Sequence, residues 1–345
     1  MKEILLIVIP HCSTGGMPQF VLKKIELLLN YYEIYIIEYN QITVKHVLHK
    51  NKIKNLIKND HYFTLSDDKS VLLNYIKVIN PNIIHFEEFP ETFVDENLCK
   101  SIYKNDREYK IFETHHGSNF DISNKKFFPD KVILVSEYYY SQLNELNIPV
   151  SIIEYPINFQ QISSIEKEEA LSKLNLNPEY KHILNVGLFN SNKNQKYAFE
   201  IANELKNEKI KFHFVGNQAD NYKPYWEPLM KNKPENCIIW GEIDSSDFYK
   251  SCDLFLFTSK LELNPLVIKE ALSYNMNTFL FNLSIYNNRY SENKLCHYLS
   301  ENVKTDANNI INYLKYPKKN RSYVSMYNDN TVMHLYKYLY TNTQI

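Results

Sequence analysis

The sequence predicts an α/β protein made of two doubly wound, Rossmann-like domains, each with a parallel sheet that helices cover on both faces. Short apolar runs alternate with amphipathic stretches along the chain, and this pattern is typical of parallel strands joined by helical crossovers. The pattern begins a second time near the middle of the chain. In addition, 345 residues exceed what one hydrophobic core usually holds.

The first half supplies six expected strands and the second half supplies five. They are 4–9, 34–37, 83–86, 110–114, 131–135 and 151–154, followed by 183–186, 210–215, 238–240, 254–257 and 278–281. The helix expected after the first strand has Pro18 at its first position and an apolar face that includes Val21, Ile25 and Leu28. Other expected helices are 195–206, 265–273 and 332–340.

These elements divide the chain into four parts. We expect an N-terminal domain over residues 1–156, a polar, strand-poor linker over 157–180 and a C-terminal domain over 181–320. A last helical segment, 321–345, is expected to pack back on the N-terminal domain. The strand ends of the two domains are expected to face each other across a cleft.

Composition excludes several classes of protein. The formal net charge of -1 gives no electrostatic footprint for a polyanion, which argues against nucleic acid as a principal partner. Five cysteines form an odd set without a Cys-x-x-Cys pair, as expected for reduced thiols. The apolar run 4–9 is too short for a signal peptide or a membrane span. We therefore expect a cytoplasmic location.

Glycine is rare, with 6 residues where average usage predicts about 24. All six follow expected strands; they are Gly15, Gly16, Gly117, Gly187, Gly216 and Gly241. In open α/β sheets ligands bind outside the carboxyl ends of the strands, where glycine lets the backbone approach a phosphate or a sugar. For a single glycine a simple turn explains the position equally well, but six such positions favour a ligand site. No Gly-x-Gly-x-x-Gly follows the first strand, which argues against a nicotinamide enzyme.

The segment 251–272 carries the densest motif, in which a strand leads through a loop into a helix. Asn264 suits the N-cap and Pro265 the first helical position, so the amides of Leu266 and Val267 would face an anion such as a diphosphate. Glu270 lies about one and a half turns further on, where a carboxylate accepts both hydroxyls of a ribose. Solvated helix-end charges are the alternative interpretation.

Glu262 and Glu270 are eight residues apart, and with Asp253 and Ser259 before them they resemble the E-x7-E signature of retaining glycosyltransferases of family 4. The resemblance implies the GT-B fold, with a nucleotide-sugar donor in the C-terminal domain and the acceptor in the N-terminal domain. It also implies that Glu262 binds hydroxyls of the donor sugar.

Residues 183–202 resemble the first strand, turn and helix of the same family's nucleotide domain. Lys193 matches its phosphate-binding lysine, whereas Leu188 stands where the family usually has an arginine. Lys196, one helical turn beyond Lys193, is expected to compensate in part. The strand ends near Gly216 and at Trp240 and Gly241 resemble the next two strand ends of that family's nucleotide domain, where backbone groups would hold the base.

In the first half, residues 10–20 resemble the family's glycine loop, so the amides of Gly15 and Gly16 are expected to approach the donor phosphates. Residues 113–119 resemble its strand-end histidine, and the Thr-x-His spacing indicates His116, which would hydrogen-bond the transferred sugar. A satisfied core or turn histidine is the alternative. Glu87 and Glu88 suggest an acidic surface turn rather than an acceptor contact.

We therefore expect a retaining glycosyltransferase in which His116, Lys193 and Glu262 are catalytic and the nucleotide sugar is a co-substrate rather than a cofactor. The acceptor would be a glycan, a lipid or a protein. No Asp-x-Asp and no cluster with metal spacing occurs, so we expect no metal. A nucleotide-sugar epimerase and a binding-only module of the same fold are alternatives. The lysine-rich segment 45–58 indicates either weak peripheral membrane contact or, preferably, a solvated face.

Overall fold

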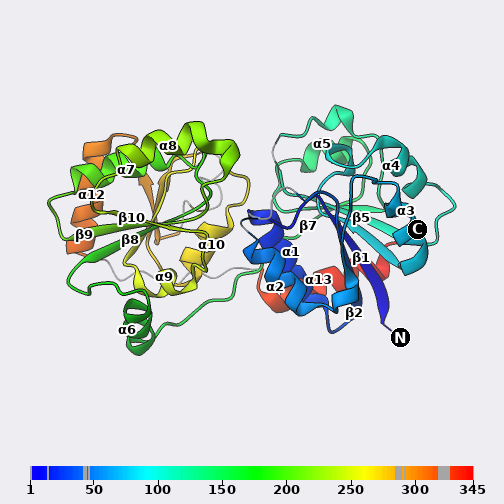
Figure 1. Ribbon diagram of the computed structural model, residues 1–345, viewed down its shortest axis with the longest axis horizontal. Helices are drawn as coiled ribbons and strands as arrows, with labels where there is room; N and C mark the ends of the chain where they lie inside the picture. The colour runs from blue at the N-terminus through cyan, green and yellow to red at the C-terminus, as the bar shows by residue number, and fades with distance from the viewer. Residues whose placement is uncertain are drawn as a thin grey trace. The chain divides into compact units, whose positions relative to one another are not determined.

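The computed structural model describes residues 2–13, 15–41, 45, 47–117, 119–283, 290, 293–317 and 327–344. The chain divides into two compact units, one of Met1–Pro156 with Met326–Ile345 and one of Ile157–Ser325. Each unit has its own sheet and its own hydrophobic cores (Figure 1).

The first unit is built on a parallel sheet of seven strands in the order β3-β2-β1-β4-β5-β6-β7. The strands are β1 (Glu3–Ile9), β2 (Tyr32–Glu38), β3 (Tyr62–Thr64), β4 (Ile83–Phe86), β5 (Lys110–His115), β6 (Lys131–Leu134) and β7 (Val150–Ile152). The α-helices are α1 (Gly16–Leu28), α2 (Leu48–Leu56), α3 (Val71–Ile79), α4 (Glu96–Ile102), α5 (Tyr140–Glu145) and α13 (Asp329–Asn342). The 3-10 helices are η1 (Asn59–His61), η2 (Pro90–Thr92) and η3 (Ile122–Asn124). The chain order reverses between β1 and β4, and doubly wound sheets bind ligands beyond the carboxyl ends of such strands.

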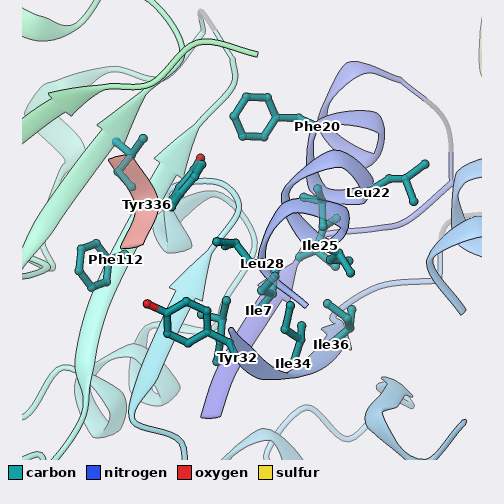
Figure 2. Packing of buried hydrophobic residues seen from close by; sticks show 14 of the residues in the cluster. Ile7, Phe20, Leu22, Ile25, Leu28, Tyr32, Ile34, Ile36, Phe112 and Tyr336 are labelled. Atoms are coloured by element: carbon teal, nitrogen blue, oxygen red, sulfur yellow. The ribbon is translucent and has the colours of Figure 1, made fainter. Parts of the chain in front are cut away.

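Helices bury both faces of this sheet. On one face the helices α1 and α13 pack over β1 and β2, and Figure 2 shows Ile25 and Leu28 of α1 with Tyr336 of α13 in this cluster. On the other face α3 and α4 cover β1, β4 and β5. The last helix is thus part of the first unit, and Lys23 Nζ of α1 lies 2.8 Å from Asp329 Oδ2 of α13.

The second unit has a parallel sheet of six strands in the order β10-β9-β8-β11-β12-β13. The strands are β8 (Lys181–Val186), β9 (Ile210–Val215), β10 (Cys237–Gly241), β11 (Leu254–Phe257), β12 (Thr278–Phe281) and β13 (Cys296–Leu299). The helices are α6 (Ser164–Lys173), α7 (Gln195–Glu204), η4 (Asp220–Tyr222), α8 (Lys223–Lys231), α9 (Ser246–Ser251), α10 (Leu266–Ser273) and α12 (Val303–Lys315). One face of the sheet packs against α7, α8 and α12, and the other packs against α9 and α10.

The predicted fold class, two doubly wound parallel sheets, is confirmed, and all eleven expected strands are present with small changes at their ends. The prediction missed β3 and β13, which are short edge strands whose side chains are mostly half-buried and so lack a strong apolar pattern. The stretch 157–180, expected as a linker, contains α6. The expected boundary at 320 and 321 lies outside the described residues.

Two helix starts differ from expectation. Helix α1 begins at Gly16 after the N-cap Gly15, so Pro18 occupies the third position rather than the first. This position also tolerates proline because the first four amides of a helix lack intrahelical partners. Helix α10 begins at Leu266 with Pro265 as its N-cap, and Asn264 is therefore not the cap residue. No helix in the described ranges has the length and apolarity that a membrane span requires.

Candidate functional site

Three glycines line the carboxyl edge of the sheet in the second unit, as predicted. Gly187 N donates to Val215 O at 2.9 Å, and Gly216 N donates to Gly241 O at 2.8 Å, so the strand ends are tied together through their backbones. A Cβ atom on Gly216 would lie 2.0 Å from Gly187 O, whereas one on Gly241 would meet nothing within 4 Å. Gly216 is therefore required by backbone packing, while open space lies beside Gly241.

Lys193 and Glu262, which belong to motifs 69 residues apart, form an ion pair beside this edge. Ser259 Oγ donates a second hydrogen bond of 2.8 Å to the same carboxylate oxygen of Glu262. The loop that carries Glu262 is fastened to the loop that carries Lys193, since Lys260 N donates to Asn192 O at 2.7 Å. The pair is partly exposed, with 25% of the Lys193 side chain and 17% of the Glu262 side chain accessible. An anionic ligand can therefore reach the lysine and compete with the glutamate for it.

Helix α10 presents its first turn without a side-chain cap, so the amides of Leu266 and Val267 are not used by a capping side chain. One turn further on, Glu270 Oε2 accepts a hydrogen bond of 3.0 Å from the hydroxyl of Tyr249. Burial, together with the charge of Glu270, raises the pKa of Tyr249 well above its ordinary value. Tyr249 therefore stays protonated and orients the Glu270 carboxylate.

The loop between β8 and α7 depends on a residue that the sequence analysis missed. Gln195 is fully buried at the start of α7, and its Nε2 donates to the carbonyl of Leu188 at 3.0 Å. Gln195 lies on the same helix face as Ala198 and Ala202. A polar residue on an apolar face indicates a buried hydrogen-bond partner, and this was the feature of the sequence that could have identified Gln195. Lys196 lies on the exposed side of the helix, where its Nζ is 3.8 Å from Glu200 Oε1.

Trp240 is anchored by two buried histidines that the sequence analysis did not single out. Indole Nε1 donates to His213 Nδ1 at 3.1 Å, and His213 Nε2 lies 2.9 Å from His182 Nδ1. Burial, and then repulsion from His182, lowers the pKa of His213 to about 3; burial also lowers the pKa of His182. Both rings are therefore neutral. Because indole is only a donor, Nδ1 of His213 accepts, and the proton of His213 is on Nε2. His213 Nε2 therefore donates to His182 Nδ1. The proton of His182 is then on Nε2, which donates to Asn177 O at 3.0 Å.

In the first unit, the strand ends hold a cluster of charged side chains. His116 follows β5, and its Nε2 lies 3.2 Å from Glu87 Oε2. Glu87 is completely buried and bonds the equally buried Lys24 at 2.5 Å. The interpretation of Glu87 as part of an acidic surface turn was thus wrong, because the positive charge that makes its burial possible comes from a helix 63 residues away.

The neighbouring His115 is turned into the core. Its Nδ1 bonds Glu88 Oε2 at 2.5 Å and its ring stacks on Phe89 with centroids 4.1 Å apart. His116 keeps some exposure and is the histidine of the pair that remains within reach of a ligand.

Gly15 and Gly16 lie at the start of α1, beyond the carboxyl end of β1. A Cβ atom on Gly15 would meet nothing within 4 Å, so the loop has open space on that side. The loop is held from behind by Glu38, whose Oε1 accepts from Cys12 N at 2.9 Å and whose Oε2 bonds Lys50 Nζ at 2.5 Å. In the described ranges, no three His, Cys, Asp or Glu side chains are arranged to hold a metal ion.

Comparisons with known proteins give one family and many structures of the same fold. Residues 166–328 match the family model described as Glycosyl transferases group 1. A glycosyltransferase from Rickettsia africae has 16% identity and a TM-score of 0.71 over 99% of this chain and 98% of that one. Anabaena HepE, solved in complex with UDP-glucose, has 10% identity and a TM-score of 0.74 over 98% of this chain and 100% of that one. The pneumococcal O-GlcNAc transferase GtfA has 9% identity and a TM-score of 0.70 over 99% of each chain.

The expectation of a GT-B fold is confirmed, since these structures and the two parallel-sheet units agree over nearly the whole chain. Among curated proteins, none matches the sequence significantly.

Proposed function

We propose that this glycosyltransferase, whose residues 166–328 belong to the group 1 family, transfers a sugar from a nucleotide-sugar donor held by its second unit to a glycan, lipid or protein acceptor. The observation that carries the proposal is the Lys193–Glu262 pair beside Gly187, next to the uncapped first turn of α10. This arrangement offers one cation and free amides to a diphosphate and one carboxylate to sugar hydroxyls.

The roles of the second unit follow from the chemistry of its groups. Lys193 and the amides of Leu266 and Val267 bind the leaving diphosphate and stabilise its charge. The carboxylate of Glu270, oriented by Tyr249, accepts the ribose hydroxyls, and the Glu262 carboxylate accepts hydroxyls of the donor sugar.

The base contacts backbone groups at Trp240 and Gly241, where open space is available. In the first unit, the amides of Gly15 and Gly16 are available to phosphate groups and His116 is available to a sugar hydroxyl. Lys196 adds a second positive charge near the phosphates, in place of the arginine for which Leu188 stands.

We assign a retaining, metal-independent course to the reaction. Lys193 and backbone amides supply the positive charge that a divalent ion would otherwise bring to the leaving diphosphate. The acceptor attacks the anomeric carbon on the face from which the diphosphate departs. We assign the protein to the cytoplasm, a location supported by its five cysteines, all of which are free thiols.

A thermal-shift screen over UDP, GDP, ADP and their sugar conjugates tests the proposal, with UDP-glucose as the first probe because HepE was solved with it. A bound donor at 100 times its dissociation constant adds about 2.7 kcal/mol to the stability. A chain that no nucleotide or nucleotide sugar stabilises would contradict the proposal.

The donor so identified is then incubated with candidate acceptors, with and without EDTA, and the products are analysed. A glycosylated acceptor formed equally in EDTA is the expected result. Loss of turnover that manganese restores would refute metal independence. A new nucleotide sugar formed from donor alone would indicate the epimerase.

A further inference from the structure

A buried charged cluster in the first unit lies directly behind His116. Lys24 of α1 and Glu87 after β4 both have fully buried side chains, and their charged atoms are 2.5 Å apart. Such a pair gives little net stability, because two well-packed apolar residues would serve as well or better. The contacts of Glu87 therefore deserve an explanation beyond stability.

The two oxygens of Glu87 have different partners. Oε1 bonds Lys24 Nζ, and Oε2 lies 3.2 Å from His116 Nε2. Burial by itself would raise the pKa of Glu87, but Lys24 and the neighbouring histidines outweigh burial and hold that pKa well below its ordinary value. Glu87 is thus a carboxylate, which accepts hydrogen bonds and donates none.

Lys24 is enclosed by polar and aromatic groups that keep it in place. Its Nζ lies 3.3 Å from His85 Nε2 and 3.4 Å from Thr114 Oγ1. The ring of Tyr336 from α13 covers it, with the centroid 4.7 Å from Nζ. This cation–π contact makes the last helix part of the surroundings of Lys24.

The direction of the hydrogen bond decides what His116 offers to a ligand. Because Glu87 only accepts, Nε2 of His116 carries the proton of this hydrogen bond, and Nδ1 is an acceptor when the ring carries that one proton. The backbone N of His116 donates to Glu88 Oε1 at 3.2 Å, and its ring forms a T-shaped contact with Phe20, with centroids 5.1 Å apart. Among the described residues, Nδ1 of His116 has no hydrogen-bond partner.

We propose that Lys24 and Glu87 are a positioning pair that holds His116 in the Nε2–H tautomer and presents Nδ1 as the acceptor of a hydroxyl hydrogen from a sugar ligand. The ligand half of this inference rests on the proposed function. Lys24 has a specific part: without its charge a buried Glu87 would be protonated and could donate to Nε2, which would turn Nδ1 into a donor. His116 is accordingly a recognition group for a hydroxyl and does not protonate the leaving group.

Nitrogen-15 NMR of histidine-labelled full-length protein tests the tautomer, with His116 assigned from the signals missing in His116→Gln. The expected result is a protonated Nε2 and an unprotonated Nδ1 at neutral pH. In the volume-preserving double variant Lys24→Met/Glu87→Gln, which removes both charges of the pair, the His116 signals should move. The matched control, called the Lys125/Glu113 variant, is Lys125→Met/Glu113→Gln combined with Glu91→Gln, because Lys125 bonds both Glu113 and Glu91 at 2.9 Å in the same unit.

Calorimetry with UDP and UDP-glucose tests the ligand half on the same proteins, after circular dichroism has verified their folds. His116→Gln and the Lys24/Glu87 variant should bind UDP-glucose about tenfold more weakly than the parent and UDP equally well. The Lys125/Glu113 variant should match the parent. A protonated Nδ1 in the parent, unchanged His116 signals in the Lys24/Glu87 variant, or equal losses for both ligands would overturn the inference. A parent that binds neither ligand overturns the proposed donor and the ligand half, while the nitrogen signals still decide the tautomer.

Discussion

The two units place different chemistry at the carboxyl ends of similar sheets. In the first unit the charged pairs near these ends are buried; they are Lys24–Glu87 and Lys50–Glu38. In the second unit the strand ends are formed by glycines tied through their backbones, and the Lys193–Glu262 pair beside them is partly exposed. The buried histidines behind this edge are neutral.

This difference separates groups that can bind a ligand from groups that hold a loop or another side chain in position. A buried ion pair cannot exchange partners without leaving an uncompensated charge, so it fixes a loop or a side chain. A partly exposed pair can exchange its partner for a ligand at small cost, because solvent screens both charges. We therefore expect substitutions in the first unit to act mainly on stability and geometry, and substitutions at the exposed pair of the second unit to act on ligand affinity.

Gly216→Ala should have the largest effect, because the new Cβ atom would lie 2.0 Å from the backbone oxygen of Gly187. Backbone cannot move aside as a flexible side chain can, so we expect a loss of more than about 4 kcal/mol of unfolding free energy. Urea denaturation followed by tryptophan fluorescence measures it, since both tryptophans, Trp226 and Trp240, belong to the second unit.

Gly241→Ala is the matched control, because its Cβ atom meets nothing within 4 Å although its φ is 73°. We expect a cost of about 1–2 kcal/mol from backbone strain alone. Equal losses for the two variants would contradict the packing role of Gly216.

Lys50→Met should cause the next largest loss of unfolding free energy. It removes the cation that bonds the Glu38 carboxylate at 2.5 Å, and it leaves that buried charge with hydrogen bonds alone. We expect the unfolding free energy to fall by about 3–5 kcal/mol. Urea denaturation followed by circular dichroism is the measurement. Lys58→Met is the control, because Lys58 pairs with Glu33 on the surface and should leave the denaturation midpoint unchanged.

The fold and half of the candidate site could be predicted because their signals are local. Apolar runs bounded by polar turns define the strands, and the segments around Lys193 and Glu262 each carry a recognisable motif within 22 residues or fewer. The ion pair between them follows from topology, since β8 and β11 are neighbours in the sheet. Parallel neighbours bring their carboxyl ends to one edge.

The positioning groups could not be predicted, because their partners are distant in sequence. Lys24 lies on the apolar stripe of α1 between Val21 and Ile25, and nothing near it in the chain indicates Glu87. Gln195, His182 and His213 likewise occupy buried positions on a helix or strand. A polar residue at such a position shows that a partner is needed, but only the tertiary structure identifies it.

Lys193→Ala tests the exposed pair. We expect it to cost about 1.5–3 kcal/mol of donor affinity through the lost charged hydrogen bond, with a much smaller change in stability. Lys196→Ala should cost less, because Lys196 is exposed and its Nζ is 3.8 Å from Glu200. Calorimetry of both variants with the same donor gives the comparison. If the Lys196→Ala variant binds the donor as well as the parent does, Lys196 does not replace the missing arginine. If the Lys193→Ala variant binds the donor as well as the parent does, the proposed diphosphate site is wrong.

A pH-dependent contribution to the stability of the second unit comes from the two buried histidines behind Trp240. In the native state the pKa of His213 is lowered to about 3, whereas an unfolded histidine titrates near about 6.5. Between these values the unfolded chain binds more protons than the native one, so stability is complete above about pH 6.5 and falls as the pH decreases toward 3. Each histidine that stays neutral contributes up to about 1.4 kcal/mol per pH unit to the slope of unfolding free energy against pH.

We expect urea denaturation of the second unit, followed by tryptophan fluorescence from pH 7.5 to 4.5, to show this decrease in stability. His213→Gln keeps an acceptor for the indole and a donor for His182 but cannot titrate, so its slope should be shallower. An equal slope in His213→Gln and the parent would mean that groups elsewhere in the unit bind the protons.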